Sequence, residues 1–282
     1  MHDFLWARKE LSGLDPVQDA RRYAQITYES RFGLPVFIHA LISVAFAYNM
    51  GDPRIAATLY REGTGAIVKN TRQRNFETLV FFGLIYKHGD GPEGRKIIER
   101  MQRIHGHFQI PNELYLYTLA TLACLPRRLS ERFAGKDGLT RDELEAQFQL
   151  WLRVGRMMGI EDIPPTQDAY LAWMLDYEKR CFRYSEAGEQ VVRALAEEWA
   201  DYWFPGPLKR VGEGIFYALI DPELHDLLGV PKVPAWQMRL AKGIVAGFLK
   251  AVRLMPDAPE RSLIETFSRH IDAVKLEARL AT

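Results

Sequence analysis

Apolar residues recur along this chain at the three- and four-residue spacing of helices, and strand-like alternation of apolar and polar residues is nearly absent. The clearest helix begins at Thr140, which forms a capping-box pattern with Glu143, and ends near Gly159. Another begins at Ser185 and places apolar residues as far as Trp199 on one face. The pattern predicts an all-α, multi-helix globular fold, with further helices at about 16–30, 35–49, 53–61, 65–86, 92–108, 112–133, 166–182, 207–228, 235–253 and 258–279.

Turn residues separate the predicted helices, and none of these breaks resembles a low-complexity linker. They are Gly51-Asp52-Pro53, Gly89-Asp90-Gly91-Pro92, Ile163-Pro164-Pro165, Pro205-Gly206-Pro207 and Pro256-Asp257-Ala258-Pro259. No motif repeats with a period of roughly 20 to 50 residues, which argues against a helical solenoid. We therefore expect one domain of residues 1–282, with the helices of 235–280 packing on the rest.

Residues 32–51 form the longest stretch without a charged side chain, and this stretch could be read as a membrane span. It contains Pro35, His39, Ser43 and Asn49, so its apolar part is shorter than the roughly 20 residues that a span requires. A buried core helix is the better interpretation. Contact of the folded protein with a membrane surface stays open, because aromatic residues make up 12% of the chain.

Charge and cysteine content narrow the range of partners and compartments. The 37 Lys and Arg residues nearly balance 36 Asp and Glu residues and are spread along the chain, so we expect no nucleic-acid partner. Cys124 and Cys181 lie in apolar helical contexts without metal-ligand spacing, which fits a reducing compartment. The first ten residues lack the long apolar stretch of a secretory signal, so the expected location is the cytoplasm.

Several catalytic motifs are missing from the sequence. No Glu stands three residues before a His, which removes the Glu-x-x-His pair of di-iron bundles and the His-Glu-x-x-His zinc motif. A phosphate-binding loop, a nucleophile elbow and an Asp-Asp-x-x-Asp cluster are also missing. The two Gly-x-Gly sequences, Gly63-Thr64-Gly65 and Gly212-Glu213-Gly214, do not follow a predicted strand. Nucleotide-binding, serine-hydrolase and terpene-cyclising functions are therefore unsupported.

The predicted helix at 92–108 carries two histidines that point in different directions. His105 lies on the same face as Ile98 and Met101, whereas His107 is aligned with Arg100 on the charged flank. An unbroken helix cannot direct both rings to one metal, so His105 is the better candidate for an inward-facing ligand. Alternatively, His105 is an ordinary core histidine that donates to a backbone carbonyl.

Arg74 and Thr78 stand four residues apart and therefore share one face of the predicted helix at 65–86. A partly buried guanidinium offers a planar fork and a permanent charge to a carboxylate-bearing ligand such as a haem propionate. In the simpler interpretation, Arg74 marks the exposed end of the helix and Thr78 bonds back to a preceding carbonyl.

Five segments of the chain form a pattern by their order and spacing. They are Arg74-x-x-x-Thr78, Met101 to His107, Pro111 to Tyr117, Trp151 to Pro164 and Tyr177-Glu178. This pattern resembles the MpaB and rubber-oxygenase family over roughly residues 50–230. The Met-Gly-Ile-x-x-Ile-Pro pattern at 158–164 is closer to the MpaB-like branch.

This resemblance implies an all-α fold around haem b, with a histidine as the axial iron ligand and an Arg and a Thr near the haem. Carried over to this chain, it makes His105 the metal ligand, makes Arg74 and Thr78 the catalytic pocket pair, and adds Arg103 to the cofactor-binding residues. Relatives use O2 to cleave carbon–carbon double bonds of isoprenoid chains. The expected function is therefore oxidation or cleavage of an apolar isoprenoid or lipid substrate by O2.

One residue departs from the rubber-oxygenase pattern. Rubber oxygenases carry a Lys next to the Thr, whereas Glu77 precedes Thr78 here, so a smaller lipid or isoprenoid is a better expectation than rubber. Two other functions stay open. The chain could be a haem protein without oxygenase activity, such as a peroxidase-like protein or a sensor, or a helical lipid-binding protein without haem.

Overall fold

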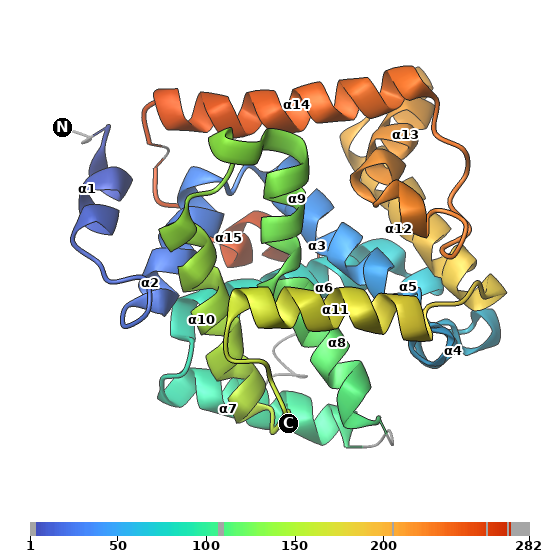
Figure 1. Ribbon diagram of the computed structural model, residues 1–282, viewed down its shortest axis with the longest axis horizontal. Helices are drawn as coiled ribbons and strands as arrows, with labels where there is room; N and C mark the ends of the chain where they lie inside the picture. Colours follow the sequence, from blue (N-terminus) through green and yellow to red (C-terminus); the bar gives the residue numbers. More distant parts are fainter. Residues whose placement is uncertain (1–3, 107–109, 205, 258, 270, 272–282) are drawn as a thin grey trace.

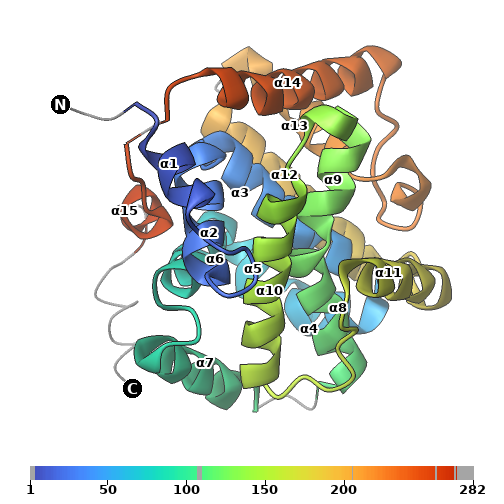
Figure 2. The same ribbon diagram turned by 60° about the vertical axis from the view of Figure 1, so that its left-hand side comes forward.

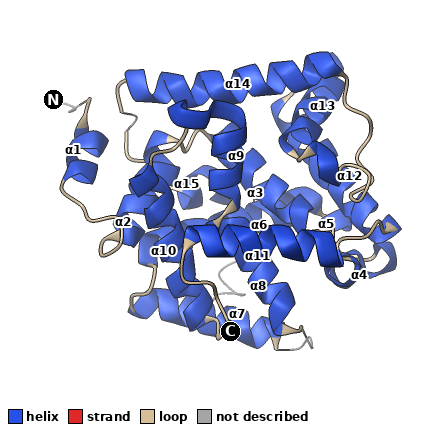
Figure 3. Cartoon of the chain, in the orientation of Figure 1, coloured by secondary structure: helices blue, strands red, loops and turns tan. Residues whose placement is uncertain are grey.

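The computed structural model describes residues 4–106, 110–204, 206–257, 259–269 and 271, and within these ranges it contains helices and loops but no strand (Figures 1 and 3). The all-α prediction is confirmed. The α-helices are α1 (Trp6–Ser12), α2 (Ala20–Gln25), α3 (Pro35–Asn49), α4 (Pro53–Tyr60), α5 (Ala66–Lys69), α6 (Thr71–His88), α7 (Pro92–His105), α8 (Asn112–Ala123), α9 (Leu125–Ala134), α10 (Arg141–Met157), α11 (Gln167–Cys181), α12 (Glu186–Trp203), α13 (Lys209–Leu219), α14 (Ala235–Leu254) and α15 (Leu263–Ser268).

Shorter helical turns connect several of these elements. One of them, η1 (Ile26–Arg31), is a π-helix that continues directly from α2. The others are 3-10 turns, namely η2 (Arg61–Gly63), η3 (Gly135–Asp137), η4 (Gly206–Leu208) and η5 (Pro222–Leu224).

The predicted helix starts are capped by their own side chains. Thr140 and Glu143 form the expected capping box at the start of α10, and Gly159, with a φ of 73°, follows the end of that helix. Ser185 accepts a hydrogen bond from the backbone N–H of Gly188 at the start of α12. Because such caps satisfy otherwise orphaned N–H groups, each stabilises its helix by about 1 kcal/mol.

Helix α6 lies in the middle of the fold and contacts α2, α3, α5, α7, α12 and α15 (Figures 1 and 2). Its Gly83 permits the close approach of α15, because a Cβ there would lie 3.0 Å from atoms of Leu263 and Ile264. Phe267 of α15 also packs against Phe76 of α6, with 5.2 Å between ring centroids. Residues far apart in sequence therefore fix the position of the helix that carries Arg74 and Thr78.

Three predicted helices are divided in the structure. The helix predicted at 65–86 breaks at Asn70, whose φ of −136° is not helical, into α5 and α6. The one predicted at 112–133 breaks at Cys124, because Pro126 suits only the first turn of a new helix. The one predicted at 207–228 ends at Leu219, and a 3-10 turn follows.

The predictions were also wrong near both ends of the chain. Helix α1 was missed, and the helix predicted at 16–30 begins at Ala20 and changes to a π-helix at Ile26. The helix predicted at 258–279 is only α15, Leu263–Ser268, within the described residues. Residues 258, 270 and 272–279 of that prediction lie outside the described ranges.

The uncharged stretch at 32–51 contains α3, a largely buried helix, as predicted. Across the described ranges, no single helix meets the length and hydropathy expected of a membrane span. One pair meets them by length and composition, but its helices, Ala20–Arg31 and Pro35–Asn49, are bent by 119° relative to each other.

Candidate functional site

Helices α6 and α7 form an antiparallel hairpin that brings His105 opposite Arg74. The short connection at Gly89-Asp90-Gly91 reverses the chain, with Gly89 at a φ of 52°. Arg74 stands 14 residues before the end of α6 and His105 stands 13 residues after the start of α7. At ~1.5 Å of rise per residue, both lie about 20 Å from the turn and therefore at the same level of the hairpin.

Arg74 and Thr78 bond to each other within α6. The Arg74 guanidinium donates from Nη1 to Thr78 Oγ1 at 2.5 Å, and the Thr78 hydroxyl donates to the Arg74 carbonyl at 2.9 Å. The second bond is the helical back-bond that the simpler interpretation of Thr78 predicts. The first bond shows in addition that Thr78 holds the guanidinium in place.

The His105 imidazole is half-buried, and its Nδ1 has no hydrogen-bond partner among the described residues. The alternative of a core histidine that donates from Nδ1 to a backbone carbonyl is therefore not what these residues show. The ring of Tyr115 lies 5.6 Å away, centroid to centroid. Burial, and secondly the positive charge of Arg74, lower the pKa of His105. Both effects favour the neutral imidazole, which is the form that binds a metal.

Arg103, the other cofactor-binding candidate on α7, is exposed, and its position two residues before His105 places it on a different side of that helix. His107, the histidine that the sequence assigns to the charged flank, lies outside the described residues. The candidate site therefore consists of Arg74, Thr78 and His105, with Tyr115 beside it.

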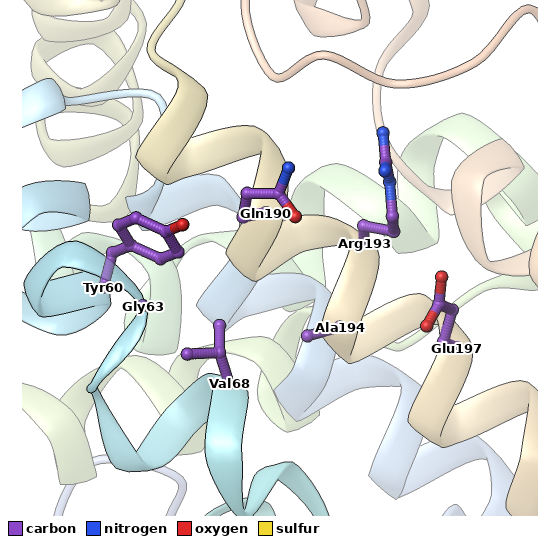
Figure 4. A pocket seen from close by; sticks show the side chains of 7 residues that line it. All are labelled: Tyr60, Gly63, Val68, Gln190, Arg193, Ala194 and Glu197. Atoms are coloured by element: carbon purple, nitrogen blue, oxygen red, sulfur yellow. The ribbon is translucent and has the colours of Figure 1, made fainter.

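Two hollows occur elsewhere, and neither is lined by Arg74, Thr78 or His105. The larger is a cleft of about 280 Å³ between the η2 turn and α12, lined by Tyr60, Gly63, Val68, Gln190, Arg193, Ala194 and Glu197 (Figure 4). The smaller is a cavity of about 20 Å³ among α3, α6, α8 and α10, lined mostly by apolar side chains. In the described part of the chain, no three His, Cys, Asp or Glu side chains are grouped so as to hold a metal ion.

Sequence reasoning missed a buried polar cluster behind α6. His39 of α3 is fully buried and accepts at Nδ1 from Trp203 Nε1, at 3.0 Å. Its Nε2 therefore carries the ring proton and donates to Glu198 Oε2, at 3.2 Å. The Asn75 amide nitrogen donates to Ser43 Oγ at 2.8 Å and to Glu198 Oε2 at 3.3 Å.

The charge in this cluster is stabilised by hydrogen bonds. Burial raises the pKa of Glu198, but hydrogen bonds from His39, Asn75 and Arg72 outweigh it, so the net pKa lies below the usual range. The only hint in the sequence was the occurrence of His39 and Ser43 one turn apart in an apolar helix.

Comparison with known proteins identifies the family. The family model described as "ER-bound oxygenase mpaB/B'/Rubber oxygenase, catalytic domain" matches residues 31–254, well over half of the chain. The chain belongs to the MpaB/rubber oxygenase family. The matched range includes the 50–230 expected from the motifs and extends beyond both ends, so the predicted resemblance is confirmed.

A solved structure of this family supports the fold of this MpaB/rubber oxygenase family member. The structure of latex clearing protein in the closed state matches with a TM-score of 0.55 and 16% sequence identity, covering 94% of this chain and 75% of that one. This likeness establishes the fold alone. No curated protein sequence matches the chain. The family is an oxygenase family that depends on haem.

Proposed function

We propose that this chain is a haem b-dependent oxygenase that uses O2 to oxidise or cleave an apolar substrate of the isoprenoid or lipid class. Family membership supports the oxygenase part of this proposal. The observation that carries the cofactor assignment is the buried Nδ1 of the half-buried His105, which lies opposite Arg74 and has no hydrogen-bond partner among the described residues. A buried polar atom without a partner costs free energy, and a ligand at that nitrogen would relieve the cost.

The described residues fit a haem by their chemistry. A neutral imidazole with an unpartnered nitrogen suits an axial ligand, and the permanently charged Arg74 suits a propionate. Thr78 would orient the guanidinium, in the way that outer hydrogen bonds commonly support the groups around a metal. When bound, haem b supplies an iron that binds and activates O2.

The chain's own residues have separate tasks in this proposal. His105 holds the cofactor, Arg74 anchors and orients it, and Thr78 keeps Arg74 in position. The ring of Tyr115 lies beside the His105 imidazole, tilted by 41° relative to it. Arg103, which the family resemblance adds to the cofactor residues, is exposed on a different side of α7 from His105, and its part in cofactor binding stays a prediction.

Absorption spectroscopy and O2 uptake test the proposal together. After reconstitution with haem, the wild-type protein should show a Soret band that His105→Ala loses and that His107→Ala keeps. His88→Ala is a matched control, because His88 is half-buried at the other end of the α6–α7 hairpin. Haem-loaded protein should then consume O2 only when an alkene substrate is present.

Each alternative function predicts a different outcome. A Soret band without alkene-dependent O2 uptake across a panel of isoprenoids would indicate a haem protein that is not an oxygenase. The lack of a Soret band after reconstitution would indicate a helical protein that binds no haem. Equal haem retention by His105→Ala and His107→Ala would overturn the assignment of His105.

A further inference from the structure

Helix α14 lies along one edge of the molecule and is fixed to it by its inner face (Figures 1 and 2). Its 20 residues, about 30 Å in length, pack against α9 and α13. The ring of Phe248 stacks on that of Phe37, with centroids 3.8 Å apart, and Arg253 donates to the Gly138 carbonyl. The orientation of α14 on the protein is therefore well defined.

The opposite face of α14 is apolar and open to solvent. Trp236 is 51% exposed, Leu240 and Ile244 are each 38% exposed, and Leu254 is 78% exposed. These four residues, which we call the outer face of α14, share an arc of roughly 100° because their spacing follows the helical repeat. Between them, a Cβ added at Gly243 or Gly247 would meet no atom within 4 Å. Single exposed apolar residues are ordinary, but several on one face of the same helix indicate an interaction surface.

All charged residues of α14 are basic. Arg239, Lys242 and Lys250 are exposed and flank one side of the outer face, and none forms an ion pair with a described residue. The helix contains no Asp or Glu over its whole length. An apolar stripe bordered by unpaired cations is the pattern of a helix that lies in the headgroup region of an anionic membrane.

The apolar surface continues past the C-terminal end of α14. Met255 is 57% exposed and Phe4 is 66% exposed. They are held near each other because Arg8 donates to the Met255 carbonyl at 2.6 Å and the Asp257 N–H donates to the Phe4 carbonyl at 2.7 Å. Exposed apolar side chains of the N-terminal segment therefore lie close to the C-terminal end of α14.

We propose that the outer face of α14 docks this protein on the surface of an anionic lipid membrane. The helix axis would lie parallel to the membrane, with Trp236, Leu240, Ile244 and Leu254 inserted among the acyl-chain ends and the three cations at the phosphates. A second copy of this chain is a poorer partner, because two α14 helices face to face would bring like charges together. The proposal does not depend on haem, although docking would concentrate the enzyme where apolar substrates dissolve.

Vesicle flotation tests this proposal on the full chain. The protein should float with phosphatidylcholine vesicles that contain phosphatidylserine, less with phosphatidylcholine alone, and less as salt is added. Lys242→Gln with Lys250→Gln should weaken binding about 25-fold, since each cation near an anionic surface contributes about fivefold. Trp236→Ala with Leu254→Ala should weaken binding at least tenfold, because both large exposed side chains lose their insertion.

Matched controls come from α11, which also carries exposed residues. Leu175→Ala and Lys179→Gln remove a 37% exposed leucine and an exposed lysine, and both should bind like the wild type. All variants should keep the wild-type circular dichroism, because the changed side chains are exposed. Failure of the wild type to float, or equal losses in the α11 and α14 variants, would overturn the proposal. A wild-type dimer that the α14 variants dissociate would also overturn it, by showing that a second copy covers this face.

Discussion

His39 and His105 both lie on helices that adjoin α6, but their ring nitrogens differ in whether they have hydrogen-bond partners. His39 is fully buried, and its two nitrogens meet Trp203 and Glu198. His105 is half-buried, and its Nδ1 has no partner among the described residues. The comparison teaches that a structural histidine is recognised by nitrogens whose partners are already in the fold, whereas a candidate ligand keeps unfilled hydrogen-bonding capacity.

The largest expected difference between the two histidines is in stability. His39→Phe fits an aromatic surrounding that includes Phe76 and Phe267, but it removes the imidazole partner of the buried Glu198 carboxylate. We expect it to lower the free energy of unfolding by about 3 kcal/mol. His105→Phe in the haem-free protein should lower it by less than about 1 kcal/mol. Urea denaturation of both variants measures this, and equal losses would remove the distinction between the two sites.

A smaller effect should appear in the titration of His105. Arg74→Met removes a nearby positive charge that disfavours the imidazolium, so the pKa of His105 should rise toward its ordinary value. Arg103→Met is a matched control, since Arg103 is nearer in sequence but exposed on another side of α7, and should leave that pKa unchanged. NMR titration of the His105 ring protons in haem-free protein reports both values.

The lowered pKa of His105 also makes the stability of the folded protein depend on pH. Because the pKa of His105 is lowered on folding, the unfolded chain binds more protons, and this contribution to stability declines as pH falls below about 6.5. The decline should be shallower in Arg74→Met. A rise in the His105 pKa with Arg103→Met but not with Arg74→Met would contradict the placement of Arg74 opposite His105.

Capping residues in the sequence predicted where two helices begin, because a cap acts on residues close to it in the chain. The capping box at Thr140 and the cap at Ser185 act within four residues, so the starts of α10 and α12 could be recognised. The break at Asn70 could not, because Asn is tolerated in helices and only the packing of α5 and α6 decides its backbone angles.

The candidate site was predictable to the extent that it depends on one hairpin. Two helices of known length joined by a short turn place Arg74 and His105 at the same level. The cluster around His39 joins α3, α6 and α12, and a single sequence does not show which distant helices meet. Its partners Glu198 and Trp203 looked like ordinary residues of an amphipathic helix.

Haem titration of His105→Gly, with and without imidazole, tests the central claim most directly. The account predicts that the wild type develops a Soret band, that His105→Gly does not, and that added imidazole restores the band by replacing the missing ligand. His39→Gly is not a suitable control because it should unfold the protein, so His107→Gly is used and should titrate like the wild type. A wild-type Soret band in His105→Gly without imidazole would contradict the assignment of His105 as the axial ligand.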